Sequence, residues 1–333
     1  MLYCEPGADA AVRTMAKTLE WRSATASDAG RMRAENQDRA YADDELGIFL
    51  VVDGLGGHAA GEKAAETAVD VIRQAIVNPD GDLRDEVRRA ITAANNRIFE
   101  EAAENEDWRG MACVLTLAVI AEDKVIVGHV GDSRLYLTWN GAIRKLTSDH
   151  SPVGEREDAG ELTEAEAMAH PRRNEVFRDV GSRRRAPDEE DFIEVKEFLF
   201  KPDAAILLCS DGLSDLLTST EMLEVMERYN GDPAQVAHEL VEAANVAGGN
   251  DNVTAIFVAG SEFLGNASPA AAEARARNAI TKARDEVVAQ LAAEPSAGVW
   301  AKVARVLTTR AAFLIYGFVL GIALALALRW PKP

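Results

Sequence analysis

The sequence has few residues of the kinds that bind soft metals or form disulfides, with three cysteines and five histidines among 333 residues. The cysteines, Cys4, Cys113 and Cys209, have no metal-ligand spacing, and no Cys-x-x-Cys occurs. This scarcity argues against a cysteine-based zinc site. Cys113 and Cys209 lie in apolar runs, so we expect buried free thiols in a reducing compartment.

Basic residues are also in deficit, with 36 Lys and Arg against 55 Asp and Glu and a net charge of −19. This balance argues against nucleic acid as the main partner, because phosphate backbones require a basic surface. The N-terminus has no basic stretch followed by an apolar one, so it does not read as a signal peptide. Hydrophobic residues make up 47% of the chain, which is enough for a sizeable globular core.

Carboxylates occur in a repeated setting. Asp53, Asp132 and Asp211 each follow an apolar, strand-like run and sit in a glycine-containing turn. One Asp-Gly after a strand is most simply a turn, but the construction recurs. Asp38 and Asp251 lie in polar loops beside asparagines. A site made of aspartates selects hard cations, manganese or magnesium.

Two such ions about 3.5–4 Å apart would polarise a phosphoryl group and generate a hydroxide between them. Arg33 could then clamp the phosphate oxygens by bidentate hydrogen bonds. Taken by itself, Arg33 is better explained as a surface arginine.

Hydrophobic periodicity predicts a mixed α and β domain that begins near Trp21. Amphipathic helices are expected at 62–77, 83–103, 163–169, 220–228 and 233–247, and strands at 39–42, 48–52, 111–121, 124–130, 135–139, 142–146, 192–199, 204–209 and 255–259. Residues 147–187 are mostly polar and irregular, which is typical of a functional or mobile segment. Residues 1–20 carry little information.

The composition changes after residue 260. Residues 261–310 read as a helical linker, and 299–309 suit a helix at a membrane surface. Residues 311–328 contain no charge, and 18 helical residues span roughly 27 Å, the low end for crossing a bilayer. Arg310 and Arg329 bracket this run, and Trp330 reads as an interfacial anchor. We expect a transmembrane helix at 311–328 and a short tail at 329–333; the alternative is a buried core helix.

Lys302, Arg305 and Arg310 precede the apolar run, so we expect a single-pass C-terminal anchor in the cell membrane with the catalytic domain in the cytoplasm. Gly317 and Gly321 form a Gly-x-x-x-Gly spacing that could allow a weak helix-mediated dimer. The same spacing also arises by chance.

Seven stretches occur in a fixed order between about residues 21 and 260. They are Arg33-x-x-Asn36-Gln37-Asp38, Val52-Asp53-Gly54-Leu55-Gly56-Gly57-His58-x-x-Gly61, Val130-Gly131-Asp132-Ser133-Arg134, Leu146-Thr147-x-Asp149-His150-Ser151, His170-Pro171-x-Arg173-Asn174, Ser210-Asp211-Gly212-Leu213-x-Asp215 and Asp251-Asn252-x-Thr254. Together they resemble the bacterial branch of the type-2C, or PPM, metal-dependent serine/threonine protein phosphatases.

The resemblance implies an α+β fold, a four-layer α-β-β-α sandwich of two antiparallel sheets flanked by helices, over residues 21–260. It also implies a flap at about 151–187 that controls substrate access, with Asn174 in it. The implied reaction is in-line attack by metal-bound hydroxide on phosphoserine or phosphothreonine in proteins, opposing a serine/threonine kinase at the membrane.

The resemblance also assigns site residues. Two core manganese or magnesium ions, with a possible third, would be held by Asp38, Asp53, Gly54, Asp132, Asp211 and Asp251. Asp53 would bridge two ions, Gly54 would offer its backbone carbonyl, and Asp132 with Asp211 would hold the third ion. Arg33 would bind the substrate phosphate. Arg33, Asp53 and Asp211 are the implied catalytic residues.

Three positions depart from the family pattern. Leu55 replaces the histidine that many eukaryotic members carry as a general acid, which leaves a metal-bound water or His58 as the proton donor. Met111 and Ala112 replace small hydroxyl residues, and Gln37 replaces a glutamate. Two other functions stay open: a catalytically weak phosphoprotein-binding module of the same fold, and a two-metal phosphoesterase that acts on small molecules.

Overall fold

The computed structural model describes residues 20–56, 59–76, 81–186, 189 and 191–265. These residues form two five-stranded sheets in which every neighbouring pair of strands is antiparallel. Sheet A has the order β1 (Trp21–Asp28), β10 (Val253–Gly260), β9 (Ala205–Cys209), β6 (Arg134–Trp139) and β7 (Ala142–Lys145). Sheet B has the order β2 (Arg39–Asp43), β3 (Ile48–Leu55), β4 (Ala112–Ala121), β5 (Lys124–Val130) and β8 (Glu194–Leu199).

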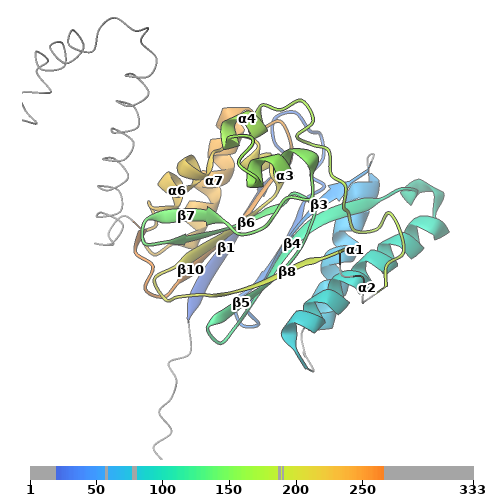
Figure 1. The fold of residues 1–333 in the computed structure, drawn as a ribbon, viewed down its shortest axis with the longest axis horizontal. Coiled ribbons are helices and arrows are strands. Elements are labelled where there is room, and N and C mark those ends of the chain that lie inside the picture. The colour runs from blue at the N-terminus through green and yellow to red at the C-terminus, as the bar shows by residue number, and fades with distance from the viewer. Residues whose placement is uncertain (1–19, 57–58, 77–80, 187–188, 190, 266–333) are drawn as a thin grey trace, which may run out of the picture. The chain divides into compact units, whose positions relative to one another are not determined.

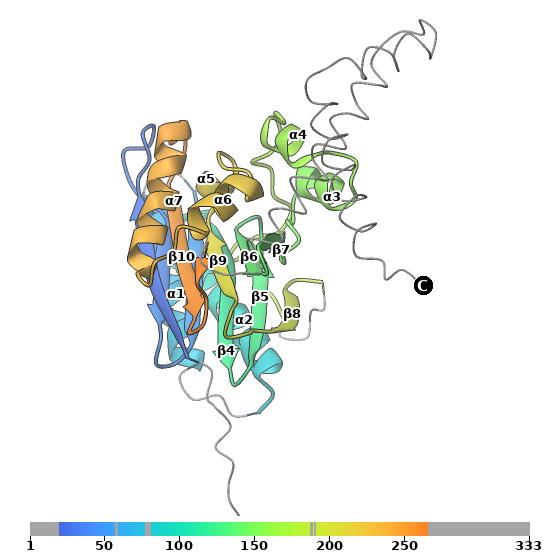
Figure 2. The ribbon, with the colours of Figure 1, turned by 90° about the vertical axis from the view of Figure 1, so that its left-hand side faces the viewer.

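Helices cover the outer faces of the two sheets, as Figures 1 and 2 show. Sheet B packs against α1 (Ala59–Ile76) and α2 (Leu83–Glu104), which is followed by the short 3-10 helix η1 (Glu106–Trp108). Sheet A packs against α6 (Ser219–Met226) and α7 (Pro233–Ala247). The remaining helices are α3 (Pro152–Asp158), α4 (Glu164–Met168) and α5 (Asp211–Ser214).

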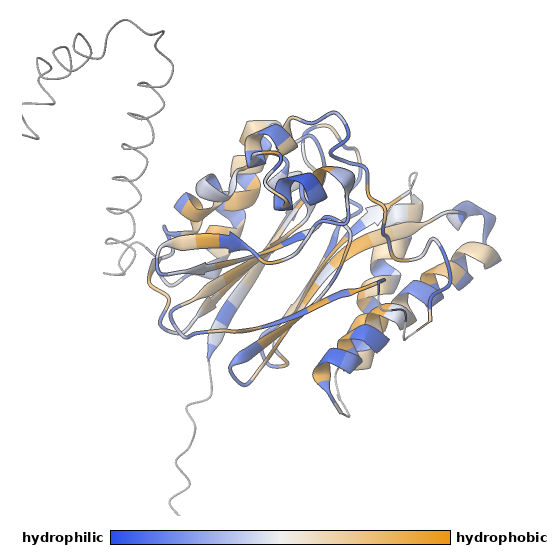
Figure 3. Cartoon of the chain, in the orientation of Figure 1, coloured by the Kyte–Doolittle hydropathy of each residue, from blue (hydrophilic) through white to orange (hydrophobic). Residues whose placement is uncertain are grey.

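Strand β3 shows how the sequence generates these layers. Successive side chains of a strand point to opposite faces. Ile48, Leu50 and Val52 lie in the cluster shared with α1 and α2, whereas Phe49 and Val51 lie in the cluster between the two sheets. Both faces are buried from Ile48 to Val52, so this part of the strand is apolar at every position and not at alternate ones. Figure 3 shows these apolar strands enclosed by helices with polar outer faces.

The predicted sandwich of two antiparallel sheets with flanking helices is therefore confirmed. Cys113 and Cys209 are buried free thiols, as expected. One prediction was wrong: the flap is not irregular outside 163–169, because α3 forms at its start. The Ser151 side chain caps α3 by accepting a hydrogen bond from the Gly154 N–H, and Pro152 at the first helical position favours the turn.

Strand β1 was not predicted as a strand, and its place at the edge of sheet A beside β10 accounts for its weak apolar alternation.

Among the described residues, no helix is both long and apolar enough to cross a membrane. The predicted linker, the predicted anchor at 311–328 and the tail lie outside the described part of the chain, as do residues 1–19 and His58.

Candidate metal centre

The end of β3 brings Asp53 and Gly54 to one edge of sheet B. Asp53 pairs with Val114 of β4 and keeps part of its surface accessible. At Gly54, a Cβ atom would lie 2.3 Å from the Gly61 carbonyl oxygen and 2.8 Å from that of Gln37. Only glycine allows this close approach of the three backbone segments.

Sheet A contributes carboxylates to the same place. Cys209, the last residue of β9, pairs with Ala255 of β10 and with Arg134 of β6. Asp211 and Asp132, which lie two residues beyond Cys209 and two before Arg134, therefore leave sheet A at one end.

Hydrogen bonds join the two sheets there. The Ser210 hydroxyl of sheet A donates to Asp38 Oδ2 at 2.7 Å, although the two residues are 172 positions apart. The Asn252 side chain accepts from the Gln37 N–H at 2.8 Å and donates to the Glu35 carbonyl at 2.8 Å. The loop before β2 is thus fixed against the loop that carries Asp251.

The gathered carboxylates raise one another's pKa values. Burial raises the pKa of Asp53 well above its usual range, and repulsion from Asp38 and Asp211 adds to the effect. Asp211 is raised well above its usual pKa by burial and by Asp132. Burial raises the pKa of Asp38 to about 6 and, helped by Asp149, that of Asp132 to about 7.

These residues fit a hard cation. Asp38 Oδ1 and Asp211 Oδ1 are buried and have no hydrogen-bond partner among the described residues, which is costly unless something positive completes them. An all-oxygen set of this kind suits magnesium or manganese. No three His, Cys, Asp or Glu side chains in the described ranges are already closed around one point.

Arg33 lies beside this group. Its Nη2 donates to Asp251 Oδ2 at 2.7 Å, and its side chain is 53% exposed. The hydrogen bond to Asp251 raises the pKa of Arg33, and the charges of Asp211 and Asp53 add to the rise. An exposed ion pair is weak, so a phosphate can compete with Asp251 for this guanidinium.

Residues 27–243 match the model of the family described as protein phosphatase 2C. The serine/threonine phosphatase stp of Listeria monocytogenes is 36% identical over 70% of this chain and 93% of its own length. The chain belongs to the protein phosphatase 2C family. PstP of Mycobacterium tuberculosis is 35% identical over 72% of this chain and 45% of its own length.

Solved structures agree with this membership in the protein phosphatase 2C family. The crystal structure of Mycobacterium tuberculosis PstP has a TM-score of 0.65 and 33% identity over 72% of this chain and 98% of that one. A structure of the PstP catalytic domain in complex with two manganese ions also has a TM-score of 0.65, with 32% identity over 73% of this chain and 99% of that one.

A second group of charges borders the metal centre of this phosphatase 2C chain. Arg134 is buried and donates to Asp149 at 2.6 Å and to Glu157 of α3 at 2.9 Å. Lys145 approaches Asp158 at 2.9 Å. We call these five residues the Arg134 network. Motifs in the sequence contain Arg134 and Asp149, but nothing in their spacing showed that they pair with each other.

The flap meets the centre through Arg173, whose Nε donates to Asp215 Oδ2 at 2.6 Å. Asn174, the flap residue predicted from sequence, is the exposed neighbour of Arg173. A cavity of about 20 Å³ lies at this junction, lined among others by Asp132, Asp211 and Asp215. Asp215 therefore belongs to the surroundings of the site, and its place one helical turn after Asp211 was the available signal.

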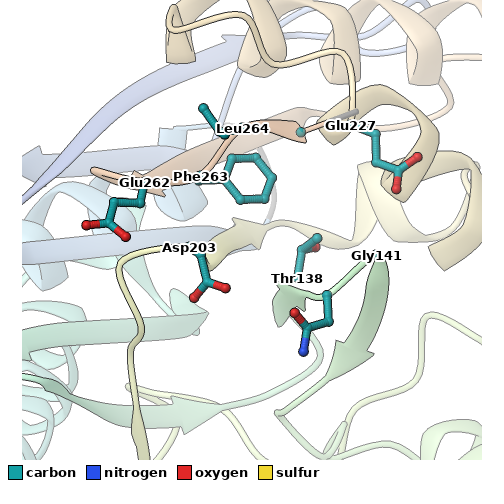
Figure 4. Close-up of a pocket in the computed structure, with 9 residues that line it drawn as sticks. Thr138, Gly141, Asp203, Glu227, Glu262, Phe263 and Leu264 are labelled. Carbon is teal, nitrogen blue, oxygen red and sulfur yellow. The ribbon is translucent and has the colours of Figure 1, made fainter. Parts of the chain in front are cut away.

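Another small pocket lies far from this centre (Figure 4). It is lined by Thr138, Asp203, Glu227, Glu262 and Phe263, among others. Thr138 pairs with Ala205 at the opposite end of β9 from Asp211. The interior volume of about 20 Å³ admits about one water molecule.

Proposed function

We propose that this chain is a manganese- or magnesium-dependent phosphatase that hydrolyses phosphoserine and phosphothreonine in proteins. The observation that carries the proposal is the meeting of Asp38, Asp53, Asp132 and Asp211 at one end of the sandwich without a lysine or arginine bonded to them in the described residues. Membership in the protein phosphatase 2C family supports it, because curated relatives carry the name serine/threonine phosphatase.

In this proposal Asp38, Asp53, the Gly54 carbonyl, Asp211 and Asp251 would hold two cations, with Asp53 shared between them. Asp132 and Asp211 would hold a third. When bound, the cations activate water and stabilise charge on the phosphoryl oxygens. Arg33 exchanges Asp251 for the substrate phosphate and orients it for in-line attack.

The buried surroundings of Asp53 and Asp211 give each carboxylate a strong preference for a positive partner. Ser210 holds Asp38 in its orientation by the 2.7 Å hydrogen bond. The chain's own contribution is thus to fix the carboxylates, to exclude competing cationic side chains and to keep Arg33 exposed.

A phosphothreonine peptide tests the activity directly. We expect phosphate release with manganese or magnesium and none with chelator, and loss of release in Asp53→Asn and Asp211→Asn. A catalytically weak phosphoprotein-binding module would instead bind the peptide without releasing phosphate. A small-molecule phosphoesterase would release phosphate from p-nitrophenyl phosphate but not from phosphoproteins.

We further propose that residues 311–328 anchor the chain in the cell membrane with residues 21–260 in the cytoplasm, where the phosphatase opposes a serine/threonine kinase. The support is the uncharged run of 18 residues between Arg310 and Arg329. Full-length protein should sediment with membranes, and deletion of 311–333 should release it. Recovery of the full-length chain in the soluble fraction would contradict the anchor. A weak dimer through Gly317 and Gly321 would be lost in Gly317→Leu.

A further inference from the structure

The peptide that precedes Asp132 is held from two sides by buried histidines. The Gly131 N–H donates to His150 Nδ1 at 3.0 Å. The Gly131 carbonyl accepts from His129 Nε2 at 3.0 Å and from the His150 backbone N–H at 2.6 Å. His129 is completely buried and His150 is 6% exposed. The Gly131 backbone thus donates one hydrogen bond and accepts two, all with two histidines, and we call this arrangement the histidine clamp.

Gly131 cannot be replaced by a larger residue that would fix the peptide sterically. Its φ angle is +110°, and a Cβ atom would lie 2.2 Å from Val114 Cγ1. Glycine has wide conformational freedom. The direction in which the chain enters Asp132 therefore depends on the clamp.

Each histidine ring makes a defined hydrogen bond with the Gly131 backbone. A carbonyl only accepts, so His129 Nε2 carries the proton and Nδ1 faces the Thr116 hydroxyl at 2.9 Å. His150 Nδ1 accepts from the Gly131 N–H, and on the other side of the ring Arg178 Nη1 lies 3.2 Å from Nε2. Burial lowers the pKa of both rings, that of His150 to about 3, which keeps them neutral and preserves these roles.

His150 also holds the flap. Its carbonyl accepts a hydrogen bond from the Phe177 N–H at 2.9 Å, and the two rings lie 6.2 Å apart. The residue that bonds Gly131 is therefore also one of the residues that bond the flap. His150 therefore links the flap residue Phe177 to Gly131, beside the other flap contacts such as Arg173 with Asp215.

We propose that His129 and His150 are positioning residues that orient Asp132 for metal binding and couple that orientation to the flap. The inference rests on the proposed function, since it assigns Asp132 to a metal ion. Neither histidine contacts substrate in this proposal. Each acts through the Gly131 peptide.

Matched substitutions separate hydrogen bonding from packing. In His150→Asn the amide oxygen can replace Nδ1 as acceptor, whereas His150→Leu fills space without an acceptor. In His129→Gln the amide nitrogen can replace Nε2 as donor, whereas His129→Leu cannot. The exposed His238 of α7, changed to Leu, controls for loss of a histidine elsewhere.

Amide hydrogen exchange of metal-free protein, over the peptide that spans 130–134, tests the clamp without reference to activity. We expect exchange about tenfold faster in each Leu variant, since a buried hydrogen bond is lost, and within about twofold of wild type in His150→Asn and His129→Gln. Manganese titration of activity should show a half-saturating concentration raised about tenfold in the Leu variants and restored in the amide variants.

The proposal is overturned if the Leu and amide variants exchange alike and titrate alike with manganese, because packing alone would then explain the histidines. If a Leu variant does not fold, the amide variants alone test the proposal. The clamp is contradicted if either amide variant weakens manganese binding as much as Asp132→Asn does. Wild-type protein without phosphatase activity but with a protected Gly131 would refute the proposed function and leave the hydrogen-bonded clamp in place.

Discussion

Two groups of buried carboxylates lie side by side in this molecule and differ in what balances their charge. In the Arg134 network, burial acts to raise the pKa of Asp149, but Arg134 and Lys145 hold it below its usual value. In the metal centre, burial and mutual repulsion raise the pKa values of Asp53 and Asp211 far above theirs. The first group carries its own cations, and the second needs cations from outside.

In the proposed function, this difference separates structural carboxylates from metal-binding ones. The two groups are close enough to influence each other, since Asp149 raises the pKa of Asp132. Removing a carboxylate should therefore change the free energy of unfolding in opposite directions in the two groups. It should expose an uncompensated arginine in the Arg134 network and relieve repulsion in the metal centre.

The largest effect is expected for Asp53→Asn. Loss of the bridging carboxylate should lower kcat by at least about 10³-fold, several kcal/mol of transition-state stabilisation. The metal-free protein should unfold at an equal or higher urea concentration than wild type, because one repelling charge is gone. Initial rates on a phosphothreonine peptide and urea titrations in EDTA measure both. Wild-type turnover in this variant would refute the bridging role.

Asp149→Asn should instead lower the free energy of unfolding. It leaves the buried Arg134 guanidinium without its main partner, which typically costs about 3–5 kcal/mol of unfolding free energy. The double variant Asp149→Leu with Arg134→Met should recover much of that loss. Urea denaturation measures the free energy of unfolding of each variant. A loss of less than about 1 kcal/mol would mean that the network is not a buried ion-pair system.

Manganese should stabilise the protein through the metal centre alone. At 100 times its dissociation constant, a single bound ion adds about 2.7 kcal/mol to the unfolding free energy. We expect this gain in wild type and in Asp149→Asn, and its loss in Asp53→Asn. Thermal unfolding with manganese and with EDTA tests the prediction. Equal stabilisation of Asp53→Asn would place the ion elsewhere.

The two groups should respond oppositely to pH in EDTA. Asp132, with its pKa raised to about 7, binds more protons when folded than when unfolded, so its contribution is present below about pH 4 and is lost as pH rises through 7. The depressed pKa of Asp149 gives a contribution present above about pH 4 and lost below it.

One such carboxyl changes the unfolding free energy by at most about 1.4 kcal/mol per pH unit. Urea titrations between pH 4 and 8 should therefore show a shallower decline in Asp132→Asn than in wild type. An unchanged slope would show that Asp132 titrates normally in the folded chain.

The smallest effect is expected for Arg33→Lys. The exposed Arg33 contributes little to stability, so the unfolding free energy should stay within about 0.5 kcal/mol of wild type. Lysine keeps the charge but not the bidentate geometry, so kcat/KM should fall about tenfold. Arg134→Lys is the buried counterpart and should lose stability instead. An Arg33→Lys enzyme with unchanged kcat/KM would remove Arg33 from phosphate binding.

Much of this fold could be predicted from sequence because its elements carry local signals. Helix α7 begins and ends at the predicted residues, 233 and 247, and β5 at 124 and 130. Pro233 follows the capping Asp232, and β5 contains the β-branched apolar residues Val125, Ile126 and Val127 in a row. Helix α3 was missed because it is short and polar, and its start depends on Ser151 and Pro152 and not on a periodic apolar face.

The aspartates of the candidate site could be predicted from sequence, but the side chains to which they bond could not. Asp149 and Asp211 look alike in sequence, yet only Asp149 meets a buried arginine. Arg134 lies two residues from Asp132 but bonds Asp149, 15 positions away. Side chains two positions apart on a strand share a face, but their partners come from other strands and loops. Long-range pairs such as Ser210 with Asp38 are set by the packing of two sheets.

A crystal soaked in manganese and measured at the manganese absorption edge tests the central claim most directly. The account predicts anomalous peaks bound by Asp53, with Asp211 and Asp251 as further ligands, and no peak at Asp149. Manganese bound in the Arg134 network, or bound without Asp53, would contradict it.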